Sequence, residues 1–185
     1  MIKRVLLFLI LLNFNNFANA SIKNKIILKL KKINNISFNF EQTINKKKET
    51  GNCIIEYPKK IFCAYDNKIK KIIVSDGKSL VVKNLMSNQY YIYPLKKTPL
   101  YIILDKDYLI SQIKEINERI IEDKFINFTL KKQNIEMNIF FDFQTLNLIG
   151  WQTEDIYQNL VITFIHSLEI NSKIDEKKFK LPLME

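Results

Sequence analysis

The feature that most constrains the fold of this chain is a pair of apolar segments on either side of Asp76-Gly77. Residues 72–74 are Ile-Ile-Val, and an alternating apolar and polar pattern returns from Leu80. Asp-Gly between two such segments is the strongest short-range signal of a β-hairpin. The segment therefore predicts two paired strands, which belong to a sheet.

A helix is predicted shortly after this hairpin. Thr98-Pro99 precedes the apolar run 100–104. We expect Thr98 to cap the helix and Pro99 to occupy its first turn, where a missing N–H costs nothing. An apolar helix that follows a sheet indicates a covered apolar surface.

Most of the remaining chain has the patterns of short strands. Residues 22–33 carry the apolar stripe of a helix, with lysines on the opposite face. From Ile36 the apolar period changes to two, which is typical of a half-buried strand. Further strands are expected at 51–56, 61–65, 69–75, 79–83, 89–93, 125–130, 135–143, 146–153 and 160–170, with a last helical turn at 175–178.

These elements define a mainly β fold of about ten antiparallel strands with two or three helices. So many apolar strands must curl into a barrel or a sandwich, because a flat sheet of that size would leave its edges and one face bare. The interior is then either a solidly packed core or an apolar pocket suited to a lipid-like ligand.

The start of the chain has the three regions of a secretory signal peptide. Lys3 and Arg4 precede an apolar run, residues 5–12, and Ala18-Asn19-Ala20 has the small residues of a cleavage site. The apolar run is far shorter than the roughly 20 residues that a membrane-spanning helix needs. We expect residues 1–20 to be removed after export, which leaves a single domain, residues 21–185, in the periplasm.

The positive charge of the chain does not indicate nucleic-acid binding. The formal net charge is +10. Nearly all of it is lysine, however, and the lysine pairs lie at the ends of apolar segments, as solvated turns do. Nucleic-acid binding favours arginine and a clustered basic footprint, so we expect no nucleic-acid partner. We also expect the protein to be a monomer.

The sequence contains no convincing catalytic or metal site. The single histidine, His166, lies in a strand pattern without the G-x-S-x-G turn of a serine hydrolase. The neighbouring carboxylates Asp105 and Asp107, or Glu154 and Asp155, are placed where turns or helix ends favour acids. We therefore expect neither an enzyme nor a cofactor.

The two cysteines flank the turn predicted at Pro58. Cys53 and Cys63 are separated by an even number of residues, so a chain reversal at Pro58 would place them on the same face. An oxidising compartment would permit a disulfide. Two buried thiols remain the alternative, because the strand register is not fixed by the sequence.

Several short motifs, in order, resemble the periplasmic outer-membrane lipoprotein carrier proteins of the LolA family, most closely the alphaproteobacterial members. The matching residues are Phe40-Glu41-Gln42, Gly51, Pro58, 61–65, Val74-Ser75-Asp76-Gly77, Tyr93-Pro94-Leu95, Thr98-Pro99-Leu100, Gly150-Trp151, Asp155, Asp175 and Phe179. The resemblance implies an incomplete, strongly curved antiparallel β-barrel closed by a lid of two to three α-helices.

The resemblance also implies a function. Such a carrier takes acylated lipoproteins from an inner-membrane ABC transporter, shields their acyl chains in a hydrophobic cavity and delivers them to the outer membrane, where a receptor accepts them. An envelope-stress module that binds lipid or protein with the same fold is the alternative. The candidate contacts for acyl chains are Phe38, Phe40, Ile55, Tyr57, Ile61 and Tyr65 on the expected concave face, with Leu100, Ile103 and Leu104 from the lid.

One position departs from the family pattern. The family has an arginine before the proline that hydrogen-bonds the lid, and this chain has Tyr57 there. A tyrosine hydroxyl cannot form the several hydrogen bonds of a guanidinium. The resemblance therefore predicts a lid that is held more weakly or by other residues.

Overall fold

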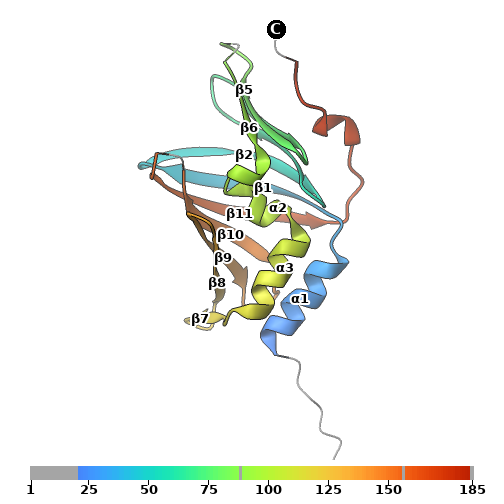
Figure 1. Ribbon diagram of the computed structural model, residues 1–185, viewed down its shortest axis with the longest axis vertical. Coiled ribbons are helices and arrows are strands. Elements are labelled where there is room, and N and C mark those ends of the chain that lie inside the picture. The colour runs from blue at the N-terminus through green and yellow to red at the C-terminus, as the bar shows by residue number, and fades with distance from the viewer. Residues whose placement is uncertain (1–20, 88, 156, 184–185) are drawn as a thin grey trace, which may run out of the picture.

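The structure is a computed structural model that describes residues 21–87, 89–155 and 157–183, so the predicted signal peptide lies outside the described residues. Its centre is one sheet of eleven antiparallel strands, ordered β6-β5-β4-β3-β2-β1-β11-β10-β9-β8-β7. The strands are β1 Asn35–Ile44, β2 Lys47–Glu56, β3 Lys60–Tyr65, β4 Lys71–Asp76, β5 Ser79–Asn84, β6 Tyr90–Pro94, β7 Arg119–Ile121, β8 Phe125–Lys132, β9 Ile135–Asp142, β10 Leu148–Glu154 and β11 Leu160–Ile170. In the described chain β6 and β7 are the two edges of the sheet and do not pair with each other, so the barrel is incomplete (Figure 1).

Three α-helices lie across one face of this curved sheet (Figure 1). They are α1 Ile22–Lys32, α2 Leu100–Leu104 and α3 Lys106–Glu115. Two short 3-10 helices, η1 Leu95–Lys97 and η2 Glu176–Phe179, complete the helical content of the described residues. The predicted fold class, an open antiparallel barrel with a helical lid, is confirmed. No helix in the described ranges is long and apolar enough to cross a membrane.

The predicted hairpin at Asp76-Gly77 joins β4 and β5. The Asp76 carboxylate accepts hydrogen bonds from the backbone N–H groups of Lys78 and Ser79, each at 2.9 Å. Gly77 has a φ of +98°, a conformation that residues with a side chain rarely adopt. The turn therefore forms for the reason that the sequence indicated.

The predicted cap of the second helix is wrong. The Thr98 hydroxyl donates a hydrogen bond to the carbonyl oxygen of Leu95 at 2.8 Å, and no side chain caps α2. Because Thr98 is the C-cap of η1, this hydroxyl closes the preceding turn and does not begin the next helix. The helical region also divides in two at Asp105, whose carboxylate accepts from the Tyr108 N–H at 3.2 Å and caps α3.

Two features of the sheet were not predicted. Strand β7 has only three residues, too few to show an alternating pattern. Strand β2 begins at Lys47, in a polar run that pairs with the end of β1 but has no apolar signal of its own.

The core lies between the concave face of the sheet and the three helices. On β1, Ile36, Phe38 and Phe40 are buried and alternate with more exposed residues. Side chains from the helices, among them Ile26, Leu104 and Ile113, join them in one apolar cluster. The convex face is covered in part by the C-terminal segment, where η2 packs against β3 and β4.

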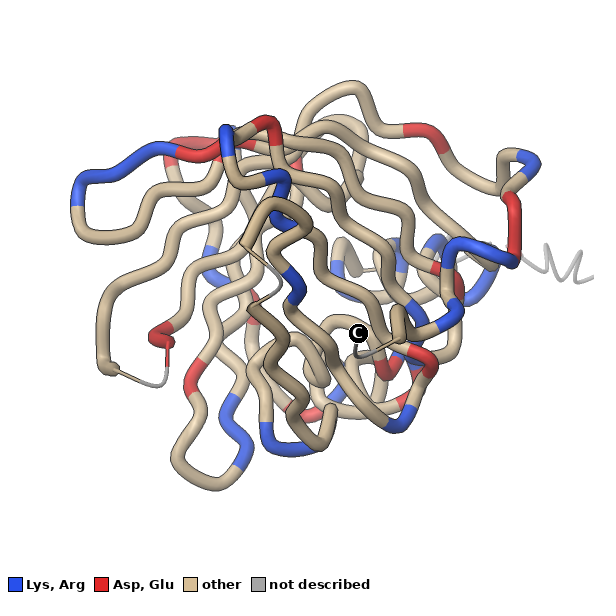
Figure 2. The backbone as a smooth tube through the Cα atoms, turned by 90° about the horizontal axis from the view of Figure 1, so that it is seen from above, with Lys and Arg blue, Asp and Glu red and all other residues tan. Residues whose placement is uncertain are grey.

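Charged residues are distributed around the whole molecule. Figure 2 shows Lys and Arg positions on turns and strand ends all over the fold, interspersed with Asp and Glu. This distribution is that of a solvated surface.

Candidate ligand cavity

Part of the concave face remains unfilled and forms a cavity of about 640 Å³. It lies between the sheet and the segment that joins η1 to α2, Lys97 to Leu100. Ligand pockets of proteins typically have about 300–1,000 Å³. Most of the wall is apolar and comes from both halves of the sheet: Phe40, Ile44, Ile61, Tyr65, Ile73, Leu80, Val82, Tyr93, Met137, Trp151 and Val161.

The structure divides the nine predicted contact residues into three groups. Four of them line the cavity: Phe40, Ile61, Tyr65 and Leu100. Four others are buried in the packed core beneath the helices: Phe38, Ile55, Ile103 and Leu104. The ninth, Tyr57, lines a separate small pocket beside α1.

Sequence reasoning missed the contribution of the distant strands. Met137 on β9, Trp151 on β10 and Val161 on β11 face the same cavity as β1. Their period-two alternation was visible in the sequence, but alternation alone does not tell which apolar face is packed and which is left open. Whether an apolar face is packed or left open depends on where the helices cover the sheet.

Gly51 makes room for an aromatic side chain in the cavity wall. It pairs with Phe40 on β1, and a Cβ atom at Gly51 would lie 2.9 Å from the Phe40 ring. It would also overlap the carbonyl oxygen of Ala64. The missing side chain at Gly51 therefore leaves space for the Phe40 ring. This ring contacts the Tyr65 ring edge to face, with the two ring centroids 4.9 Å apart.

The two cysteines lie directly opposite each other in the cavity wall. Cys53 on β2 and Cys63 on β3 form a register pair with a Cα–Cα distance of 4.1 Å, and they are joined by a disulfide. The disulfide connects the two strands that precede and follow the cis Tyr57-Pro58 peptide.

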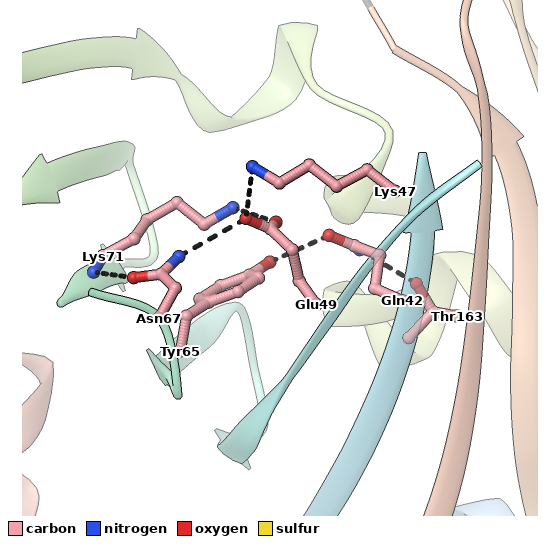
Figure 3. A network of polar contacts seen from close by, with 7 residues as sticks. All are labelled: Gln42, Lys47, Glu49, Tyr65, Asn67, Lys71 and Thr163. Atoms are coloured by element: carbon pink, nitrogen blue, oxygen red, sulfur yellow. Dashed lines mark hydrogen bonds and ion pairs between the residues drawn. The ribbon is translucent and has the colours of Figure 1, made fainter. Parts of the chain in front are cut away.

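A band of polar side chains crosses the wall at one end of the cavity (Figure 3). The Tyr65 hydroxyl donates to the Gln42 carbonyl oxygen at 3.1 Å, and the Gln42 amide donates to the Thr163 hydroxyl at 3.0 Å. Next to them, Lys71 forms an ion pair with Glu49, and its ammonium lies over the Tyr65 ring, 3.8 Å from the centroid. The band connects β11, β1, β2, β3 and β4.

The charges of this band are held in place by their partners. Burial is the largest single influence and would raise the pKa of the Glu49 carboxyl, whereas the hydrogen bond and the positive charge of Lys71 lower it. Asn67 and Lys47 contribute in the same direction, so the pKa of Glu49 lies below its usual value. Glu49 is therefore ionised at neutral pH, and its side chain is only 9% exposed.

The segment from Leu95 to Glu115, which we call the lid, is attached to the sheet at the turn between β2 and β3. The backbone N–H of Lys59 donates to the carbonyl oxygen of Leu104 at 2.9 Å. The Lys59 ammonium forms an ion pair with Asp105, with Nζ 3.1 Å from Oδ2. Both contacts join this turn to the junction of α2 and α3.

The opposite side of the lid is attached to the end of β8. The Lys132 ammonium lies 3.1 Å from the centroid of the Tyr101 ring and 4.8 Å from that of Tyr108. The Tyr108 hydroxyl donates to the carbonyl oxygen of Lys131 at 3.3 Å. The lid is therefore fixed at both sides of the sheet.

Asp105 is the centre of these lid contacts. Burial would raise the pKa of Asp105, but hydrogen bonds from Tyr101, from the Tyr108 amide and from Lys59 lower it overall. The hydrogen bond to Asp105 in turn raises the pKa of Tyr101 to about 12. One carboxylate therefore connects α2, α3 and the β2–β3 turn.

Tyr57, which replaces the family arginine, contacts the lid in a different way. In the described part of the chain its hydroxyl forms no hydrogen bond to the lid. Its ring lies 5.4 Å from the Lys106 ammonium, which donates to the carbonyl oxygen of Ile33 at 2.7 Å. On this side of the sheet, Lys59, two residues further along, forms the backbone hydrogen bond and the ion pair to the lid.

The single histidine of the chain, His166, is exposed, and its Nδ1 lies 3.3 Å from the hydroxyl of the adjacent Ser167. The described residues contain no cluster of three or more His, Cys, Asp or Glu side chains suited to a metal ion.

Solved structures with a similar fold are distant in sequence. An uncharacterized conserved protein from Thermus thermophilus aligns with a TM-score of 0.52 at 8% identity, over 85% of this chain and 93% of that one. A LolA superfamily protein from Nitrosomonas europaea has a TM-score of 0.45 at 6% identity, over 85% and 96%. A chain of the MucA/MucB complex of Pseudomonas aeruginosa has a TM-score of 0.49 at 11% identity, over 88% of this chain and 61% of that chain. At these identities the Thermus match shows the fold alone.

Sequence comparison identifies the family directly. A comparison with curated proteins finds no match. The family described as outer membrane lipoprotein carrier protein LolA matches residues 31–182. This range includes all eleven strands, the lid and η2. The chain therefore belongs to the LolA family.

Proposed function

We propose that this protein is a periplasmic carrier that takes lipoproteins from the inner membrane, encloses their acyl chains and delivers them to the outer membrane. The observation that carries the proposal is the apolar cavity of about 640 Å³ beneath the lid. Membership of the LolA family supports the same class of cargo.

The physical chemistry of the cargo explains why a carrier is needed. A lipoprotein with three acyl chains of about 16 carbons exposes about 45 methylene groups, and each contributes about 0.8 kcal/mol to membrane binding. Desorption into water would cost on the order of 35 kcal/mol. Non-covalent affinity does not exceed about 20 kcal/mol, so loading requires an energy-coupled donor such as an ABC transporter.

The disulfide supports a periplasmic location. Disulfides persist in oxidising compartments, and Cys53 and Cys63 are the only two cysteines of the chain. Residues 1–20, with the pattern of a signal peptide, supply the export step of the proposal.

A capture experiment tests this function. The purified protein without residues 1–20 is incubated with inner-membrane vesicles that contain its own transporter, with and without ATP. We expect ATP-dependent release of triacylated lipoproteins in a soluble complex with this protein. Release of the complex followed by transfer to outer-membrane vesicles supports a carrier, whereas a stable complex that passes nothing on favours a sensing module.

A pair of matched variants ties capture to the cavity. Val82→Lys places a charge in the cavity wall, while Ile92→Lys places the same charge on the neighbouring strand at a residue that is 54% exposed. We expect the Val82 variant to lose capture and the Ile92 variant to retain it. Equal capture by both variants would contradict the assignment of the cavity.

A further inference from the structure

A second, polar hollow adjoins the apolar cavity at the rim of the sheet. It has a volume of about 520 Å³ and lies where β9 begins and β10 ends, opposite the start of the lid. We call it the rim groove. Five residues line both spaces: Lys97, Pro99, Thr153, Glu154 and Asp155. The rim groove is therefore an outlet of the cavity.

The two spaces differ in chemistry. Nine of the twelve residues that line the rim groove are polar or charged, whereas most of the cavity wall is apolar. Side-chain amides come from Asn134 and Asn138 on the β9 side and from Gln152 and Gln158 on the β10 side. Amide groups can both donate and accept hydrogen bonds, which is what a polypeptide backbone requires.

Several of these polar groups are available to a ligand. Within the described ranges, the side chains of Asn134, Gln152 and Glu154 form no hydrogen bond or ion pair. Glu136 pairs only with Lys131 on the surface, at 3.0 Å. Asp155 is different, because its carboxylate already accepts from the amides of Tyr157 and Asn159.

We propose that the rim groove binds the peptide segment that follows the acylated cysteine of the cargo, while the acyl chains lie in the cavity. This inference rests on the proposed carrier function and specifies its ligand as an acylated polypeptide. A ligand with an apolar part and a hydrogen-bonding part, joined end to end, matches an apolar cavity that opens into a polar outlet. A free lipid uses only the first of the two spaces.

A comparison of two ligands tests this assignment. The first is a triacylated cysteine followed by a short, uncharged, serine-rich peptide, and the second is the same triacylated cysteine as its simple amide. Both are presented in mixed micelles, and binding is followed by the emission of Trp151, which lines the cavity and is the only tryptophan of the chain. Their acyl parts are identical, so a difference in affinity reports the peptide.

We expect the lipopeptide to bind about tenfold more tightly, the gain that two net hydrogen bonds provide. The double variant Glu136→Ala with Gln152→Ala changes only residues of the rim groove and should remove this preference without changing affinity for the peptide-free ligand. The matched control, Gln89→Ala with Glu122→Ala, makes the same substitutions at exposed positions elsewhere and should keep the preference.

The outcomes separate this inference from the carrier function. If both ligands bind equally well, or if the double variant keeps the preference, the rim groove is not a peptide site, and acyl binding in the cavity still stands. If neither ligand binds, this inference fails, and ATP-dependent capture from inner-membrane vesicles decides the carrier function separately.

Discussion

Replacing Lys59 by Met should loosen the lid by a predictable amount. The ion pair that it forms with Asp105 has a 3.1 Å separation, and the two side chains are 32% and 12% exposed. At an effective dielectric constant of about 20, Coulomb's law gives about 5 kcal/mol for such a pair. Desolvation of both groups and partial exposure of Lys59 reduce the net contribution to about 1–2 kcal/mol.

The Asp105 side of the pair adds a second contribution. Asp105 also caps α3, and loss of a capping side chain costs about 1 kcal/mol. We therefore expect Lys59→Met to lower the free energy of unfolding by about 1–2 kcal/mol and Asp105→Ala by about 2–3 kcal/mol. The double variant should lose little more than Asp105→Ala alone, because the ion pair can be lost only once.

Urea denaturation of the four proteins in this double-mutant cycle gives the coupling energy. Lys124→Met is the matched control, because Lys124 pairs with Glu122 on the surface with both side chains about two-thirds exposed or more, and no measurable loss is expected. A coupling energy between Lys59 and Asp105 below about 0.5 kcal/mol, within the usual limits of additivity, would refute the assignment of this pair as a lid contact.

Three further predictions concern the cavity wall. Gly51→Ala should lower the melting temperature strongly or prevent folding, because its Cβ would overlap a backbone carbonyl and an aromatic ring; an unchanged melting curve would show that the wall can yield. Replacing both Cys53 and Cys63 by Ala should cost about 2–3 kcal/mol in denaturant, as expected for a bridge across a sequence separation of 10 residues, and a reducing agent should then have no further effect. For Glu49, the folded pKa lies below the ordinary value of 4.5 because Lys71, Asn67 and Lys47 together outweigh burial, so its stabilisation is present above that pH and is lost as pH falls through the folded pKa. The stability difference between wild type and Glu49→Gln should therefore be largest at neutral pH and shrink in acid; a difference that stays constant with pH would contradict this.

The sequence predicts the sheet of this protein better than its cavity. The hairpin at Asp76-Gly77 and the alternating strands follow from local chemistry, since turn residues and period-two patterns act over a few neighbours. Thr98 misled the prediction because a threonine before a proline fits both the end of one helical turn and the start of another. Its hydrogen bond to Leu95 depends on η1, which the sequence does not signal.

The site was harder to predict for a related reason. Phe38 and Phe40 are successive inward residues of one strand, yet one is packed in the core and the other lines the cavity. That difference arises from where the lid covers the sheet. The contact between Lys59 and Asp105 spans residues far apart in the sequence, and no local pattern indicates it.

The most direct test of the central claim, that acyl chains occupy the cavity, uses Trp151 as an internal reporter. Its side chain is 5% exposed, it lines the cavity, and no other tryptophan contributes to the emission. A lipoprotein with brominated acyl chains is loaded onto the protein, and the purified complex is compared with one that carries unbrominated chains. We predict that bromine quenches Trp151, since quenching requires contact between the acyl chain and the indole ring. An intact complex with the same Trp151 emission for both lipoproteins would contradict the claim.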